Sequence, residues 1–130
     1  MRCSKRESRS TACATSPAEG SPAALIEIAQ AAGVAIELDE AAIPVSEPVR
    51  GASELLGLDP LYIANEGRFV AIVPEGEAER AQAVLAREGC AEAARIGRVH
   101  AGAGGVTLRT VIGSRRPLDL PSGEQLPRIC

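Results

Sequence analysis

The sequence predicts an α+β domain in which helices pack on one face of a mixed β-sheet, followed by an extended, mobile C-terminal tail. The chain has 130 residues, which is enough for one domain with its own core. Hydrophobic residues make up 45% of it and aromatic residues only 2%, so the core must consist of Ala, Val, Ile and Leu. Helical and strand patterns follow in the order helix, strand, helix, strand, helix and then several strands, which favours the α+β class.

Composition divides the chain into three segments. Residues 1–20 are rich in Ser, Thr and Arg and lack apolar periodicity, which indicates a disordered leader or a misassigned start. An organelle transit peptide is the alternative, which Glu7 disfavours. We expect the domain to span residues 21–120 and the flexible tail to span residues 121–130.

The first helix is predicted from Ser21, which can cap it, and Pro22 suits its first turn. Gly33 is expected to end it. The next stretch, "VAIELD", alternates apolar and other residues and predicts a half-buried strand. A second helix, "EPVRGASELLG", is expected to open at Pro48 and end at Gly57.

The second half begins with "FVAIVP", a short apolar run that predicts a buried strand ending at Pro74. The helix "GEAERAQAVLAREG" follows and is expected to close at Gly89. Three strands are predicted in "AARIGRVH", "GVTLRTVIG" and "RRPLDL". The stretch "AGAGG" between the first two suggests a phosphate loop only superficially, because no helix follows it. We therefore interpret it as a hairpin turn.

Several protein classes are disfavoured by composition. The net charge of −3 gives no general attraction to nucleic acid, and no apolar run is long enough to span a membrane. The cysteines form no C-x-x-C pair and the single histidine has no ligand neighbour, so no zinc site is expected. The N-terminal residues show no apolar h-region, so we expect a cytoplasmic protein with free thiols. The four cysteines are Cys3, Cys13, Cys90 and Cys130, and the single histidine is His100.

Three residues, His100, Arg115 and Arg116, each have a functional and a simpler interpretation, whereas Cys90 has only the simpler one. His100 is an acid–base group or a surface residue. Arg115 and Arg116 bind an anion or lie on a solvated edge. Neighbours on a strand point to opposite faces, so the two could bind one anion together only if the strand were broken. Cys90 is expected to be a small packing residue.

The segment Asn65-Glu66-Gly67 interrupts two apolar runs. One interpretation is a turn, in which Gly67 takes a positive φ. The other is a carboxylate at the mouth of the sheet, where partial burial would raise the pKa of Glu66 and make it a better base.

The C-terminal tail carries a cysteine on a free end. Pro121 and Pro127 exclude helix around them, and Gly123 adds flexibility. Such a tail spans on the order of 30 Å when extended, so it can carry the Cys130 thiol into another active site. The positive charge of Arg128 would favour the thiolate. An inert, frayed end is the alternative.

Two stretches, "LGLDPLYIANEGRFVAIVP" and "SGEQLPRIC", resemble the C-terminal domain of the HypE family, the carbamoyl dehydratases of hydrogenase maturation. "IEIAQAAGVAIELDEAAIPV" resembles the opening helix and strand of the same domain. The resemblance covers residues 23–130, and its most specific part is the ending "PRIC". It implies an α+β fold of the superfamily of aminoimidazole ribonucleotide synthetase and selenophosphate synthetase.

The resemblance also implies an activity. In the family, the partner carbamoyltransferase HypF transfers a carbamoyl group to the terminal cysteine, here Cys130. ATP, with magnesium, then drives dehydration to a thiocyanate, and the HypC–HypD complex receives the cyanide. The same resemblance makes Glu66 the base and Asn65 the residue that orients the carbamoyl group.

In the tail, the resemblance assigns three residues to positioning the thiol: Pro127, Arg128 and Ile129. The chain departs from the family in two respects. No counterpart is found of the N-terminal domain, which in the family forms the homodimer and most of the ATP site. The acidic and basic residues of an Asp-Pro-Thr-Arg-Gly-Gly-like stretch are replaced by residues 16–21, "SPAEGS".

These departures argue against ATP binding by this chain alone. We therefore expect a dehydratase domain that is inactive in isolation. The alternatives are a non-catalytic carrier that presents Cys130, and a degenerate fragment whose uncovered sheet face makes it associate.

Overall fold

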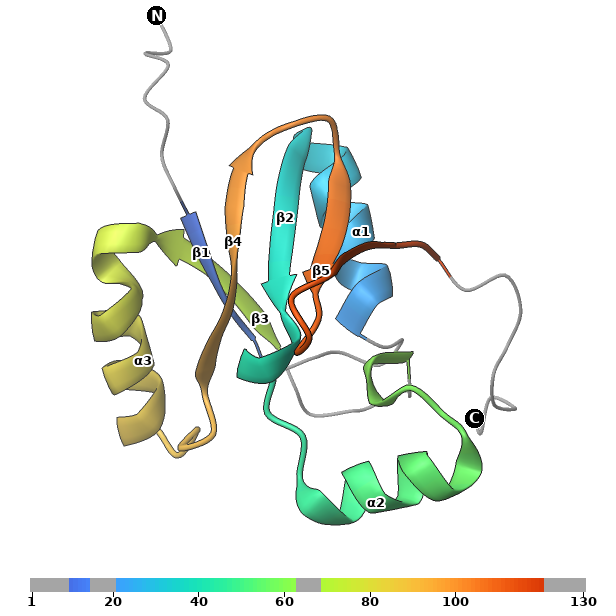
Figure 1. The fold of residues 1–130 in the computed structure, drawn as a ribbon. Coiled ribbons are helices and arrows are strands. Elements are labelled where there is room, and N and C mark those ends of the chain that lie inside the picture. Colours follow the sequence, from blue (N-terminus) through green and yellow to red (C-terminus); the bar gives the residue numbers. More distant parts are fainter. Residues whose placement is uncertain (1–9, 15–20, 63–68, 121–130) are drawn as a thin grey trace, which may run out of the picture.

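The described residues form a six-stranded mixed sheet with three α-helices (Figure 1). The computed structural model describes residues 10–14, 21–62 and 69–120. The strands are β1 (Ser10–Ala14), β2 (Val34–Asp39), β3 (Val70–Pro74), β4 (Ala94–Ala101), β5 (Gly105–Arg109) and β6 (Arg115–Leu118). The helices are α1 (Ser21–Ala32), α2 (Glu47–Leu56) and α3 (Ala78–Arg87). The predicted α+β class is confirmed.

The order of strands in the sheet is β3-β1-β4-β2-β5-β6. The β2–β5 pair is parallel, and the other four pairs are antiparallel. Helix α1 packs on β2 and β5, whereas α3 contacts β1, β3 and β4. The sheet is therefore mixed, as predicted, and its parallel pair lies under α1.

The core lies between α1 and the inner face of the sheet. The side chains of Leu25 and Ala29 in α1 are fully buried, and Ile36 and Leu38 of β2 are almost so. The pleat places alternate residues of β2 on opposite faces, so Glu37 and its neighbour Asp39 lie on the outer face. The outer face is consequently charged where the inner face is apolar.

Glycines end all three helices where the sequence predicts it. Gly33, Gly57 and Gly89 have φ angles of 63°, 66° and 95°. This left-handed region strains other residues, and a glycine there closes the last turn. The three predicted helices are confirmed at these ends.

Helix α2 makes few contacts with the other described elements. Its only buried residue is Ser53, whose hydroxyl donates to the Val49 carbonyl oxygen at 2.7 Å. Leu55 and Leu56 are 89% and 70% exposed. The apolar side of this helix therefore faces solvent.

The structure corrects the interpretation of residues 1–20 as a leader at residues 10–14 alone, and the rest of that segment lies outside the described residues. Residues Ser10–Ala14 form β1, which pairs with β3 on one side and β4 on the other. The sequence "STACA" offers small residues without clear alternation, so tertiary pairing, rather than local pattern, makes it a strand.

Two further predictions are wrong in detail. "AGAGG" is not the turn of a hairpin, because β2 lies between β4 and β5 in the sheet. The loop instead carries the chain past the end of β2. Strand β3 is not a buried central strand: it lies at the sheet edge, and Ile72 and Pro74 are exposed. The preceding β1, absent from the prediction, takes the interior position.

Candidate functional site

The residues that the sequence assigns to chemistry lie outside the described part of the chain. These are Asn65, Glu66, Pro127, Arg128, Ile129 and Cys130. Their roles stay predictions. The structure instead defines the flanking elements and a separate charged pocket.

An ion pair connects the two elements from which the predicted site segments depart. The carboxylate of Asp59 accepts a hydrogen bond from the backbone N–H of Leu61 at 3.0 Å and one from Arg116 at 2.9 Å. Asp59 precedes the short 3₁₀ turn Pro60–Tyr62, and Arg116 lies in β6. The ion pair therefore links the turn that precedes Asn65 and Glu66 in the sequence to β6, the last strand before the tail.

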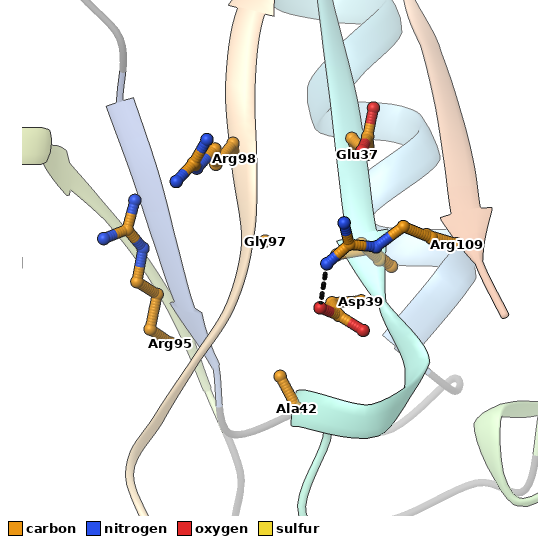
Figure 2. Close-up of a pocket in the computed structure, with 8 residues that line it drawn as sticks. Glu37, Asp39, Ala42, Arg95, Gly97, Arg98 and Arg109 are labelled. Carbon is orange, nitrogen blue, oxygen red and sulfur yellow. Dashed lines mark hydrogen bonds and ion pairs between the residues drawn. The ribbon is translucent and has the colours of Figure 1, made fainter. Parts of the chain in front are cut away.

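The charged pocket lies on the outer face of the sheet and has a volume of about 330 Å³ (Figure 2). Strands β2, β4 and β5 supply most of its walls. The lining residues are Glu37, Leu38, Asp39, Ala42, Arg95, Gly97, Arg98 and Arg109. Three arginines and two carboxylates thus share one depression.

A bulge in β4 brings two of these arginines to the same face. The register with β1 shifts so that Gly97 and Arg95 pair with consecutive β1 residues. In a regular strand, Arg95 and Arg98 would point to opposite faces. Here both guanidinium groups approach the same oxygen of Glu75, at 3.0 Å and 4.0 Å.

The opposite wall of the pocket contains an ion pair between Asp39 and Arg109 (Figure 2). The hydrogen bond donated by the Arg109 guanidinium lowers the pKa of the Asp39 carboxyl below its ordinary value. The same hydrogen bond raises the pKa of Arg109. Both groups are therefore held in their charged forms. Nearby, Arg115 lies 3.6 Å from the Glu37 carboxylate.

Gly97 separates the two walls. A Cβ built at this position would lie 2.3 Å from the carbonyl oxygen of Glu37, which no real side chain tolerates. Glycine therefore lets β4 approach the backbone of β2 closely at this point.

The sequence did not predict this pocket. Alternation in "VAIELD" places Glu37 and Asp39 opposite the core, but nothing local indicates which strands lie beside them. The expected opposite orientation of Arg115 and Arg116 is confirmed by their ion pairs with Glu37 and Asp59, respectively. His100 lies exposed in β4.

The part of the chain that the structure describes holds no group of three or more His, Cys, Asp or Glu residues that could bind a metal ion. Within the same residues, no helix is long and apolar enough to cross a membrane. Cys90 is a partly buried free thiol.

Relatives of the chain are carbamoyl dehydratases. It is 51% identical over 113 residues to the carbamoyl dehydratase HypE of Rhodobacter capsulatus, covering 85% of this chain and 33% of the relative. The HypE of Azotobacter vinelandii is 53% identical over 108 residues, covering 82% and 32%. The chain therefore spans about one third of the length of the curated relatives it matches.

Solved structures show the same likeness. A HypE crystal structure in complex with ATP matches with a TM-score of 0.80 and 43% identity, covering 90% of this chain and 37% of that one. The structure of a HypE–HypF complex matches with a TM-score of 0.75 and 35% identity, covering 83% and 36%. Residues 10–109 match the family "AIR synthase related protein, C-terminal domain". The chain therefore belongs to the AIR synthase related family, and its match is to the C-terminal domain of that family, as found in HypE.

Proposed function

We propose that this chain is the cysteine-presenting domain of a carbamoyl dehydratase that makes the cyanide ligand of nickel–iron hydrogenase. The observation that carries the proposal is the 51% and 53% identity to two carbamoyl dehydratases over most of this chain. Cys130 would carry the carbamoyl group through its sulfur, with Glu66 and Asn65 at the reacting nitrogen and oxygen.

The chemistry requires both a carrier and a base. The thiolate of Cys130 forms the S–C bond when a carbamoyltransferase delivers the carbamoyl group. The amide oxygen is a poor leaving group, and its phosphorylation by ATP releases ADP and makes it a good one. Loss of phosphate and both nitrogen protons then leaves S–C≡N. Glu66 would accept a proton from nitrogen, and Asn65 would hold the carbamoyl group by hydrogen bonds.

The described fold supports a site formed jointly by the segment around Glu66 and by the C-terminal tail. The Asp59–Arg116 ion pair fastens the turn before Asn65 to β6, the last strand before the tail. Leu61 and Leu118 belong to the same buried core cluster. The two segments therefore follow elements that an ion pair and a shared core hold together, which would limit how far the tail must reach to bring Cys130 to Glu66.

The partners of this reaction are proposals as well. A HypE–HypF complex exists among the matched structures, and we infer that a HypF-type carbamoyltransferase loads Cys130. We further propose that a HypC–HypD complex receives the cyanide in the cytoplasm. A homodimer would form through a domain outside the part that this chain shares with its relatives.

ATP is proposed as the co-substrate because a matched HypE structure contains it. The described residues of this chain offer no metal site that would hold magnesium. We propose that most of the ATP site lies in a domain outside the part that this chain shares with its relatives.

A second candidate is a non-catalytic carrier. The chain spans about one third of the length of its relatives, which favours loading of Cys130 here and dehydration by a full-length protein. The two candidates differ in whether the carbamoyl group remains unchanged on the isolated chain.

Mass spectrometry of the C-terminal peptide separates these candidates. The chain is incubated with a HypF-type carbamoyltransferase, carbamoyl phosphate and ATP, with Cys130→Ser as the control. A nitrile on Cys130 indicates a complete dehydratase, and a stable carbamoyl adduct indicates the carrier. Adding a full-length HypE should then convert the adduct to the nitrile. An unmodified Cys130 would refute both candidates.

Glu66→Gln tests the proposed base. The substitution removes the carboxylate but keeps the size, so loading of Cys130 should be unchanged. Nitrile formation should fall by about 10²-fold or more, in line with the usual contribution of a general base. If the nitrile forms at the same rate, Glu66 is not the base.

A further inference from the structure

The charged pocket has one positive charge in excess. Among the described residues that line it, three are arginines, Arg95, Arg98 and Arg109, and two are carboxylates, Glu37 and Asp39. Three guanidinium groups thus share the pocket with two carboxylates, on a chain whose net charge is −3. A local positive charge on an acidic protein favours an anion at this place.

Arg98 is the least tightly paired of these arginines. Its guanidinium lies 4.0 Å from an oxygen of Glu75, and Arg95 holds the same oxygen at 3.0 Å. The Arg98 side chain is 58% exposed. A guanidinium has five N–H donors, so Arg98 retains donors for a further acceptor.

The residues that line the pocket lie on both sides of Gly97. Figure 2 shows Arg95 and Arg98 on one side of Gly97, and Arg109 with Asp39 on the other. The volume of about 330 Å³ admits a small ion with water. The Glu37 carboxylate also lines this space, and its contact with Arg115 is loose at 3.6 Å.

We propose that this pocket binds inorganic phosphate in a protonated form, with Arg98 as its principal ligand. Guanidinium forks match the oxygen pairs of phosphate and donate two parallel hydrogen bonds to them. Around neutral pH, inorganic phosphate keeps at least one P–O–H group, which can donate to a carboxylate. Glu37 supplies that acceptor, so the pocket offers donors on one side and an acceptor on the other.

The mixed lining distinguishes phosphate from sulfate. Sulfate has the same shape and carries no proton near neutral pH. Beside Glu37 it would therefore meet a carboxylate with no hydrogen bond to offset the repulsion. The preference for phosphate follows from the pocket alone and does not depend on the carbamoyl chemistry proposed above.

Chemical-shift titration of the ¹⁵N-labelled chain at constant ionic strength tests the proposal. Sodium phosphate at pH 7 should give saturable shifts in β2, β4 and β5, and sulfate should bind at least about tenfold more weakly. Methyl phosphate provides the comparison for an ester source. It loses its last P–O–H proton near neutral pH and should also bind more weakly than inorganic phosphate.

Arg98→Gln should weaken phosphate binding by about tenfold or more, because a charge-assisted hydrogen-bond pair is lost. Arg98→Lys keeps the charge but cannot donate two parallel hydrogen bonds, so its phosphate affinity should lie between those of the wild type and Arg98→Gln. Arg116→Gln is the matched control, because Arg116 pairs with Asp59 and does not line the pocket. Glu37→Gln should reduce the preference for phosphate over sulfate. Melting curves of each variant establish that it is folded.

Four results would overturn the proposal. The first is a titration that does not saturate. The second is equal weakening by Arg98→Gln and Arg116→Gln, which would indicate nonspecific attraction to surface charge. The third is equal affinity for phosphate and sulfate, which would remove the role of Glu37. A preference for an acidic peptide over phosphate would likewise assign the surface to a protein partner.

Discussion

The side chains of Asp39 and Arg109 form an ion pair between β2 and β5. The pKa shift of Asp39 determines whether this ion pair stabilises the fold more at high or at low pH. The hydrogen bond from Arg109 lowers the pKa of Asp39 below its ordinary value of 3.8 in the folded state. A lowered folded pKa means that protons bind the unfolded state more tightly. The stabilisation is therefore fully present above the unfolded pKa and is lost as pH falls through the folded one.

Asp39→Asn should remove this dependence. Urea unfolding of both proteins should show wild type more stable near neutral pH, and the difference should shrink as pH falls below about 4. The exposed position keeps the effect small. A difference that stays constant over this range would contradict a charge-dependent contact between the two strands.

At the scale of elements, β1 is the strand that local pattern missed and that tertiary structure requires. As an interior strand it has a neighbour on each side, so its N–H groups are directed at β3 or β4. Thr11→Pro removes one of these donors and should destabilise the fold by about 3 kcal/mol or more. Thr11→Val keeps the donor and should change the unfolding free energy by less than about 1 kcal/mol. Equal unfolding midpoints for the two variants would exclude β1 from the sheet.

The elements that sequence predicted are those with local causes. Gly33, Gly57 and Gly89 end helices because only glycine adopts their backbone angles without strain, and this reason is visible in the sequence itself. Strand β1 and the loop "AGAGG" depend on which distant strands lie beside them. The charged pocket has the same origin, because the bulge that turns Arg95 and Arg98 to one face exists only in the pairing with β1.

At the scale of the whole molecule, apolar residues are divided between a tight core and an exposed helix. Leu108 is fully buried between α1 and the sheet, whereas Leu55 of α2 is 89% exposed. Leu108→Ala should cost about 2–5 kcal/mol of unfolding free energy, because it leaves a cavity. Leu55→Ser should change it by less than about 0.5 kcal/mol. Comparable losses in denaturant titrations would mean that α2 packs its apolar side within the domain.

The two ends of the sheet have a consequence for how the molecule meets its own copies. Strands β3 and β6 form these ends, and each contains a proline, Pro74 and Pro117. Proline has no N–H to offer a strand arriving from another molecule, so each border lacks a donor where sheet growth would need one. We therefore expect the fold to resist ribbon-like stacking into fibrils.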